Sequence, residues 1–123
     1  MSQSAAQAAA FYRDITKAMA VWTIRDDGGY PAPMNASGRR AQPFWSSRAR
    51  AERVVSKVDA YRGFSIVEIP WDEFRDRWIP DLERDGFLVG VNWSGPRATG
   101  YDVEPADVLA NVRGATSSSG SAG

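Results

Sequence analysis

The apolar run Phe87-Leu88-Val89-Gly90-Val91 constrains the fold of this 123-residue chain more than any other segment. Five consecutive apolar residues bounded by turn signals are typical of a central strand that is buried on both faces. A glycine inside such a strand marks a place where a second backbone or a bulky ring approaches closely. We therefore expect a buried central strand here, with a close neighbour over Gly90.

Periodic apolar residues predict most of the other elements. Helical spacing predicts an amphipathic helix at about Ser4–Met19 and a second helix at about Ser47–Ala60. β-Branched and aromatic residues predict strands at Val21–Ile24, around Ala41–Trp45 and at Phe64–Ile69. Helices and strands therefore alternate along much of the chain.

Prolines and glycines indicate where these elements end. Pro80 cannot lie in a helix interior without removing a hydrogen bond, so the helical segment Trp71–Leu82 should kink or divide into two short helices, the second starting near Pro80. Gly86 is expected to cap that helical region. After a loop at 92–101, Pro105 can open a last short helix.

Together these elements predict an α+β or mixed α/β domain, in which helices pack against a mixed or antiparallel sheet of four or five strands. The turn Asp26–Gly29 indicates a β-hairpin, whose return strand is confined to an edge by Pro31 and Pro33. Residues 1–113 are expected to form one globular domain, and residues 114–123 a disordered Ser/Gly-rich tail.

The chain contains no cysteine and no histidine. Because these residues supply thiolate nucleophiles, zinc ligands and the commonest acid–base catalyst, we predict no catalytic residue, metal site or cofactor, and an enzyme is disfavoured. The acidic segments lack the spacing of a calcium-binding loop.

No apolar run approaches the ~18 residues of a membrane helix, and no basic-then-apolar leader opens the chain, so we expect a cytoplasmic domain without membrane contact.

The net charge of zero hides an asymmetry along the chain. Residues 1–63 carry a net charge of +5 and residues 64–123 a net charge of −5. The folded domain either mixes these charges over its surface or presents a basic and an acidic face that steer a partner. Arg50, Arg53 and Lys57 form a basic stripe on the solvent side of the second predicted helix. Neutrality overall disfavours a nucleic-acid partner.

The segment Pro43–Glu52 is typical of a strand that runs directly into a helix with arginines in its first turn. A cation at a helix N-terminus costs about 0.3–1 kcal/mol unless a negative group lies nearby. Ser46 and Ser47 can serve as N-caps. Arg48 and Arg50 either pair with carboxylates of the acidic half or, with the free N–H groups of the helix start, bind an anion.

Two of the five tryptophans stand where a strand ends, and each is followed by serine. Such rings either fill the core, with the indole N–H bonded to a backbone carbonyl, or line one cleft that grips a ligand or peptide. The candidate binding residues are therefore Trp45, Ser46, Ser47, Arg48, Arg50, Asn92 and Trp93.

Four motifs follow one another along the chain: Val21-Trp22-Thr23-Ile24, Pro43-Phe44-Trp45-Ser46, Phe74…Trp78-Ile79-Pro80…Leu82 and Gly90-Val91-Asn92-Trp93-Ser94. Taken together they resemble a family of small bacterial proteins known as domain of unknown function 2750, over about residues 11–109. The resemblance implies a small bacterial cytosolic domain and carries no assigned activity or catalytic residue. The layout also resembles, as a fold-level analogy, bacterial immunity and secretion-accessory domains that bind proteins.

Three functions are compatible with these residues. The preferred hypothesis is a non-enzymatic protein-binding or regulatory module, because the usual catalytic residue types are missing and the charges are segregated. The second is a binder of a small anionic ligand at the helix start near Ser46–Arg50. The third is a carboxylate-based hydrolase, which requires two acidic side chains that converge in a concave pocket.

Overall fold

The computed structural model describes residues 2–121, with side chains as far as Thr116, and confirms an α+β fold. A three-stranded sheet contains β2 (Ala41–Phe44), β4 (Leu88–Ser94) and β5 (Thr99–Val103) in the order β2-β4-β5. Strand β4 runs parallel to β2 and antiparallel to β5, so the sheet is mixed. The apolar run of the sequence therefore lies in the central strand, as predicted.

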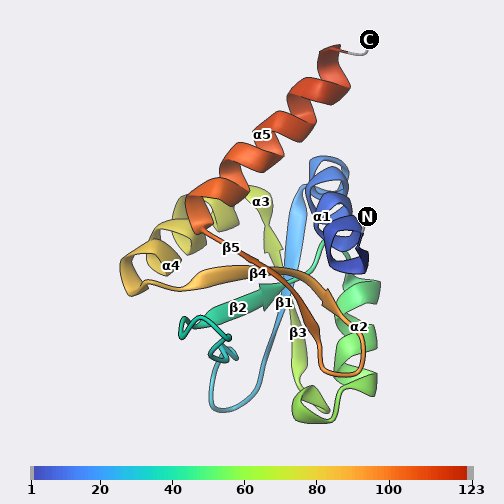
Figure 1. The fold of residues 1–123 in the computed structure, drawn as a ribbon, viewed down its shortest axis with the longest axis vertical. Coiled ribbons are helices and arrows are strands. Elements are labelled where there is room, and N and C mark those ends of the chain that lie inside the picture. The colour runs from blue at the N-terminus through green and yellow to red at the C-terminus, as the bar shows by residue number, and fades with distance from the viewer. Residues whose placement is uncertain (1, 122–123) are drawn as a thin grey trace.

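A second, two-stranded sheet pairs β1 (Ala20–Arg25) antiparallel to β3 (Ser65–Pro70). Trp22 and Trp45 exchange two backbone hydrogen bonds, of 2.9 and 2.7 Å, which connect β1 to the end of β2. Figure 1 shows that the two sheets cross near the middle of the molecule. The five strands thus form two connected sheets where one sheet was expected.

The helices cover both sides of these sheets. Helices α1, α4 and α5 contact β4 from one side, whereas α2 packs against β1 and β3 (Figure 1). Helix α1 has Ser2 as its N-cap and starts at Gln3, one residue before the start predicted for this helix. The helical segments are α1 (Gln3–Ala18), α2 (Arg48–Lys57), a 3₁₀ turn (Asp59–Tyr61), α3 (Trp71–Glu73), a π-helical turn (Phe74–Trp78), α4 (Ile79–Asp85) and α5 (Pro105–Ser121).

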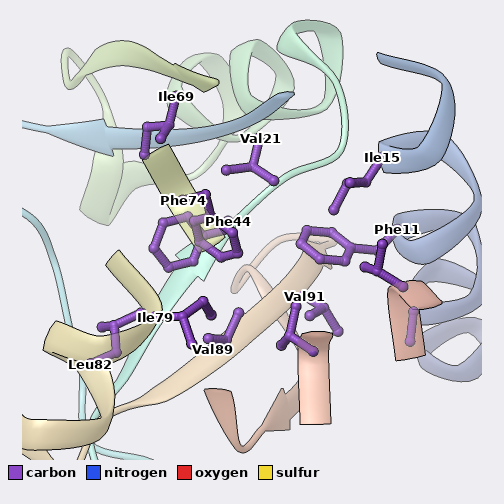
Figure 2. Close-up of a cluster of buried hydrophobic side chains, with 13 residues drawn as sticks. Phe11, Ile15, Val21, Phe44, Ile69, Phe74, Ile79, Leu82, Val89 and Val91 are labelled. Carbon is purple, nitrogen blue, oxygen red and sulfur yellow. The ribbon is translucent and has the colours of Figure 1, made fainter. Parts of the chain in front are cut away.

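Two hydrophobic clusters lie on opposite faces of β4. Val89 and Val91 belong to the cluster drawn in Figure 2, which includes Phe11 and Phe44. Leu88 belongs to the second cluster, with residues of α2 and two tryptophans. Because successive side chains of a strand point to opposite faces, β4 needs apolar residues throughout. This is the physical reason for the unbroken apolar run.

The segment around Pro80 follows its prediction. Helices α3 and α4 flank the π-helical turn, and Pro80 occupies the first turn of α4, where its missing N–H has the least effect. The N–H of Ile79 bonds to the carbonyl of Phe74, five residues back. Gly86 ends α4 in the left-handed conformation, with φ 74°, so the expected cap is confirmed.

Two expectations about strands are wrong. The β-hairpin is reduced to one bridge between Asp26 and Gly29, because the prolines that follow cannot donate ladder hydrogen bonds, and β1 instead pairs with β3. The predicted loop at 92–101 contains the end of β4 and the start of β5. Strand β5 has the sequence Thr-Gly-Tyr-Asp-Val, in which no residue is fully buried and glycine and aspartate are poor strand formers, so it gives little strand signal.

Helix α5 is longer than the short helix that was expected, and it continues past Gly114 to Ser121. Its buried contacts come from the first turns, where Val108 and Val112 join the core. Residues 122 and 123 lie outside the described residues, and the disorder expected of the tail stays a prediction.

Candidate functional site

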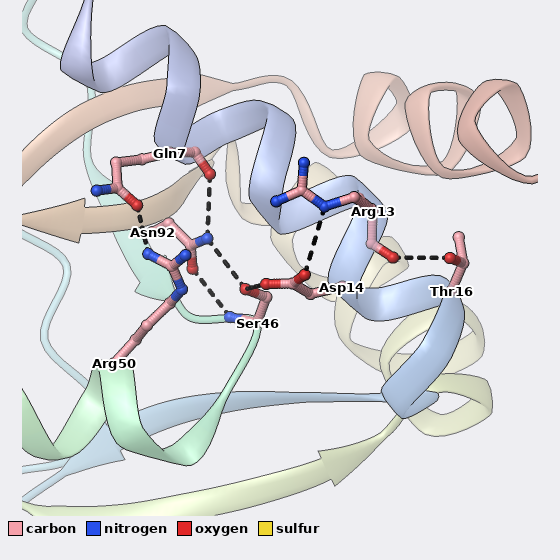
Figure 3. Close-up of polar contacts among 7 residues, drawn as sticks. All are labelled: Gln7, Arg13, Asp14, Thr16, Ser46, Arg50 and Asn92. Atoms are coloured by element: carbon pink, nitrogen blue, oxygen red, sulfur yellow. Dashed lines mark hydrogen bonds and ion pairs between the residues drawn. The ribbon is translucent and has the colours of Figure 1, made fainter.

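The junction between β2 and α2 is closed by a group of hydrogen-bonded polar residues with a buried centre, which we call the Asn92 cluster: Gln7, Asp14, Ser46 and Asn92. The side-chain oxygen of Asn92 accepts the backbone N–H of Ser46 at 2.9 Å. Its Nδ2 donates to the Gln7 carbonyl and to Ser46 Oγ, each at 3.0 Å. Ser46 Oγ in turn donates to Asp14 Oδ2 at 3.1 Å (Figure 3). The cluster joins α1, the junction and β4.

Burial removes the centre of this cluster from solvent, whereas Gln7 and Asp14 are partly exposed. Ser46 is 2% exposed and Asn92 is 1% exposed. Each hydrogen-bonding group of the Asn92 side chain has a partner inside the protein. Asn92 also adopts φ 49°, a left-handed conformation that asparagine tolerates better than most residues. The cluster therefore holds three elements together and points inward rather than toward a ligand.

Trp45 and Trp93 are linked in a second hydrogen-bond series. Trp45 is fully buried, and its Nε1 donates to the Trp93 carbonyl at 2.8 Å. Trp93 Nε1 donates to Asp102 Oδ1 at 3.0 Å, while Asn35 donates to the other oxygen of Asp102 at 2.9 Å. The ring of Trp93 is thus fixed at one edge by a carboxylate.

Gly90 leaves the space that the Trp93 ring occupies. A Cβ added at Gly90 would lie 2.3 Å from Cε2 of Trp93, and one added at Gly100 would lie 2.9 Å from Cδ1. The register shift between Val91 and Ser94, with Asn92 left-handed, brings Trp93 into the same hydrophobic cluster as Leu88. The bulky ring expected over Gly90 is therefore present, and it comes from the same strand.

The two candidate arginines of the junction have different surroundings. Arg48 Nε lies 2.9 Å from Glu52 Oε1, in an i,i+4 ion pair whose side chains are 59% and 56% exposed. Arg50 hydrogen-bonds instead to the neutral side chain of Gln7. Ser47 caps α2 by accepting the backbone N–H of Arg50 at 3.2 Å. Within residues 2–121, neither arginine pairs with the acidic half of the chain.

A cavity of about 350 Å³ lies between α2 and the turn that joins β4 to β5; we call it the basic pocket. Its cationic side chains come from one flank of α2, and its apolar side chains come from α2, β4 and the turn. None of its lining residues is acidic. The lining consists of Arg50, Arg53, Val54, Lys57, Val58, Trp93, Ser94, Gly95 and Pro96.

Two other cavities differ from the basic pocket in charge. One, of about 570 Å³, shares Trp93 with it and is lined by Tyr61, Arg97 and Asp102 among others. Burial raises the pKa of the Tyr61 phenol. The other, of about 360 Å³, lies along α4 and carries the carboxylates Glu73, Asp81 and Asp85. Only the basic pocket, of these three, presents a single sign of charge beside an apolar surface.

The structure does not bring the seven predicted residues around one opening. Trp45, Ser46 and Asn92 lie in the interior, Ser47 caps α2, and Arg48 is on the surface. Arg50 and Trp93 line the basic pocket. The other cations of the pocket belong to the stripe recognised in the sequence, whereas the turn Ser94–Pro96 had no signal that placed it beside α2. A binding role for the seven residues stays a prediction.

Trp22 provides a contrast with the two bonded tryptophans. Its Nε1 is buried without a hydrogen-bond partner in the described part of the chain. An unpaired buried donor costs about 1–3 kcal/mol. Trp22→Phe removes this cost, which stabilises the fold, but it also removes apolar contacts, which destabilises it. We expect the free energy of unfolding to change by less than about 1 kcal/mol. Trp45→Phe loses a satisfied hydrogen bond and core volume, and should cost about 2 kcal/mol.

Urea denaturation followed by circular dichroism measures both changes. Equal losses for the two variants would show that the unpaired N–H of Trp22 is not a penalty in solution.

Among the residues that the structure describes, no helix combines the length and apolar character that a membrane crossing requires.

A search of the curated proteins finds no match to this chain. The model of the family described as protein of unknown function DUF2750 matches residues 8–112, which include the basic pocket and every residue of the Asn92 cluster except Gln7. Because this match covers most of the chain, the protein belongs to the DUF2750 family.

Proposed function

We propose that this protein is a non-enzymatic binding domain whose basic pocket holds an anionic group of its ligand. The observation that carries the proposal is the combination of three cationic side chains and an apolar surface in one cavity without a carboxylate. Ligand sites are typically concave, largely apolar and fitted with a few polar or charged groups. The basic pocket has this composition.

The cations of the pocket are not neutralised internally. Arg53 and Lys57 form no ion pair within residues 2–121, and Arg50 bonds to an uncharged amide. They stand three and four residues apart along α2, where like charges repel by a few tenths of a kcal/mol per pair. An anion in the pocket would replace this repulsion with attraction.

The wider charge distribution supports an electrostatically steered ligand. Among the described residues, Arg39–Glu104 is the one ion pair that joins the basic half of the sequence to the acidic half. The other pairs join neighbours within about four residues, so the folded chain does not cancel the asymmetry by pairing its halves. Segregated charge raises the association rate of a ligand of opposite sign.

The carboxylates along α4 lend less support to a hydrolase. Arg84 forms ion pairs with both Asp81 and Asp85, at 3.1 and 3.4 Å, and all three side chains are more than half exposed. Glu73 lies eight residues before Asp81, which is roughly 12 Å along a helix. Residues spaced along one exposed helical face do not converge on a substrate as paired catalytic acids do.

The proposal is tested by NMR titration of the ¹⁵N-labelled chain with inorganic phosphate at constant ionic strength. We expect the shifts to concentrate on the amides of α2 and of Ser94 and Gly95. Lys57→Glu should weaken this binding at least about threefold, because it reverses one of three charges. Lys17→Glu is the matched control, since each lysine lies in the last turn of its helix.

Shifts that spread over the whole surface, or that survive unchanged in Lys57→Glu, would contradict a site in the basic pocket. The control variant should bind phosphate as the unaltered chain does.

A further inference from the structure

We infer that the ligand of the basic pocket is a small organic anion in which a carboxylate, sulfonate or phosphate group is attached to an apolar ring. This inference rests on the proposed function and specifies the chemical class of the ligand. Its basis is the separation of charged and apolar surfaces within one cavity.

The deep surface of the pocket is apolar and its rim is cationic. Val54, Val58 and Trp93 are each less than a tenth exposed, so the parts of them that line the cavity form its floor. Arg53 and Lys57 are exposed and therefore stand at the opening. A ligand that fills this cavity places an apolar body on the floor and leaves its charge at the rim.

Inorganic anions match only half of this surface. Phosphate at the rim contacts the cations but leaves the floor in water, and burial of apolar surface is the larger source of affinity in such sites. A peptide rich in acidic residues has the same deficiency. An apolar ring that carries a negative charge contacts the apolar floor with its ring and the cationic rim with its charged group.

The size of the cavity also favours a small molecule. At about 350 Å³ it lies near the lower end of the 300–1,000 Å³ typical of small-molecule sites. A stable protein partner needs roughly 800 Å² on each surface, far more than one flank of α2 and a short turn provide. The pocket therefore matches a single ring system with one charged group.

The apolar wall is held in position before any ligand arrives. Trp93 is fixed by its Nε1 bond to Asp102, and its ring fills the space beside Gly90 and Gly100. The carbonyl of Trp93 also accepts the indole N–H of Trp45. A preorganised wall lowers the entropy lost on binding, so a rigid ring gains most from it.

The experiment compares four probes by isothermal titration calorimetry: 1-naphthoate, its neutral analogue 1-naphthamide, inorganic phosphate and hexaglutamate. We expect 1-naphthoate to bind at least tenfold more tightly than each of the other three. Lys57→Glu should weaken naphthoate binding several-fold, and Lys17→Glu should not. Val58→Thr adds a hydroxyl to the floor at nearly constant volume, and should weaken binding of naphthoate but not of phosphate.

The outcomes separate this inference from the proposed function. Equal affinity for 1-naphthamide would overturn the inference, because the charge would then be irrelevant. Tighter binding of hexaglutamate or phosphate, lost in Lys57→Glu, would overturn the inference and leave an anion site in place. If circular dichroism shows that the parent chain is folded and none of the four probes binds to it, both proposals are overturned.

Discussion

Gly90→Ala is expected to lower the free energy of unfolding by about 3 kcal/mol, the upper part of the range for overpacked cores. The added Cβ would lie 2.3 Å from Cε2 of Trp93, a distance at which one of the two groups must shift. The ring has little freedom to do so, because Asp102 holds its N–H and Trp45 bonds to its carbonyl. Urea denaturation monitored by circular dichroism measures the loss.

Gly114→Ala is the control for this prediction. A Cβ at Gly114 meets no atom within 4 Å, and alanine favours helix over glycine by about 1 kcal/mol, so α5 should be unchanged or slightly stabilised. If Gly90→Ala unfolds at the same urea concentration as Gly114→Ala, the packing of Trp93 against β4 is looser than the structure shows.

Asn92→Ala is expected to cost about 3 kcal/mol, because it leaves the buried Ser46 N–H without a partner, removes two further hydrogen bonds and places alanine at a positive φ. The buried Ser46 N–H loses its acceptor, Ser46 Oγ loses a donor, and the Gln7 carbonyl, which lies inside α1, loses its second donor. An unpaired buried N–H of this kind costs about 1–3 kcal/mol. Thermal and urea denaturation should both show the loss, which affects the attachment of α1 as well as the β2–α2 junction.

Asn92→Gly separates the hydrogen bonds from the backbone conformation. Both variants lose the same side-chain bonds, but glycine adopts φ 49° without strain, whereas alanine does not. We therefore expect Asn92→Gly to be more stable than Asn92→Ala by up to about 1 kcal/mol. A variant Asn92→Ala as stable as the parent chain would mean that water replaces the side chain and that the Asn92 cluster does not stabilise the fold.

Local sequence patterns determined the parts of the fold that depend on local physics. The apolar run around Gly90, the break at Pro80 and the cap at Gly86 each act through their own backbone or strand, and all three expectations are confirmed. The pairing of β1 with β3 instead depends on residues about 45 positions apart. Short-range patterns carry no information about such pairing, so the second sheet was not foreseen.

The candidate site also contains features that short-range sequence patterns do not predict. Trp45 and Trp93 look alike in the sequence, since each ends a strand and precedes a serine. In the structure Trp45 is enclosed, whereas Trp93 is turned by the left-handed Asn92 and lines the basic pocket. The helical spacing of the pocket's cations was visible in the sequence, but the turn that completes the cavity approaches α2 only through the tertiary fold.

The hydrogen bond from Asn92 to the carbonyl of Gln7 spans 85 residues of sequence. Helix α1 also packs on β4, β5 and α5, all of which follow residue 87. A ribosome that synthesises this chain therefore releases α1 well before β4, β5 and α5. The apolar side chains Phe11 and Ile15 therefore remain partly uncovered until residues 88–112 have emerged, so the core is completed long after α1 has been synthesised.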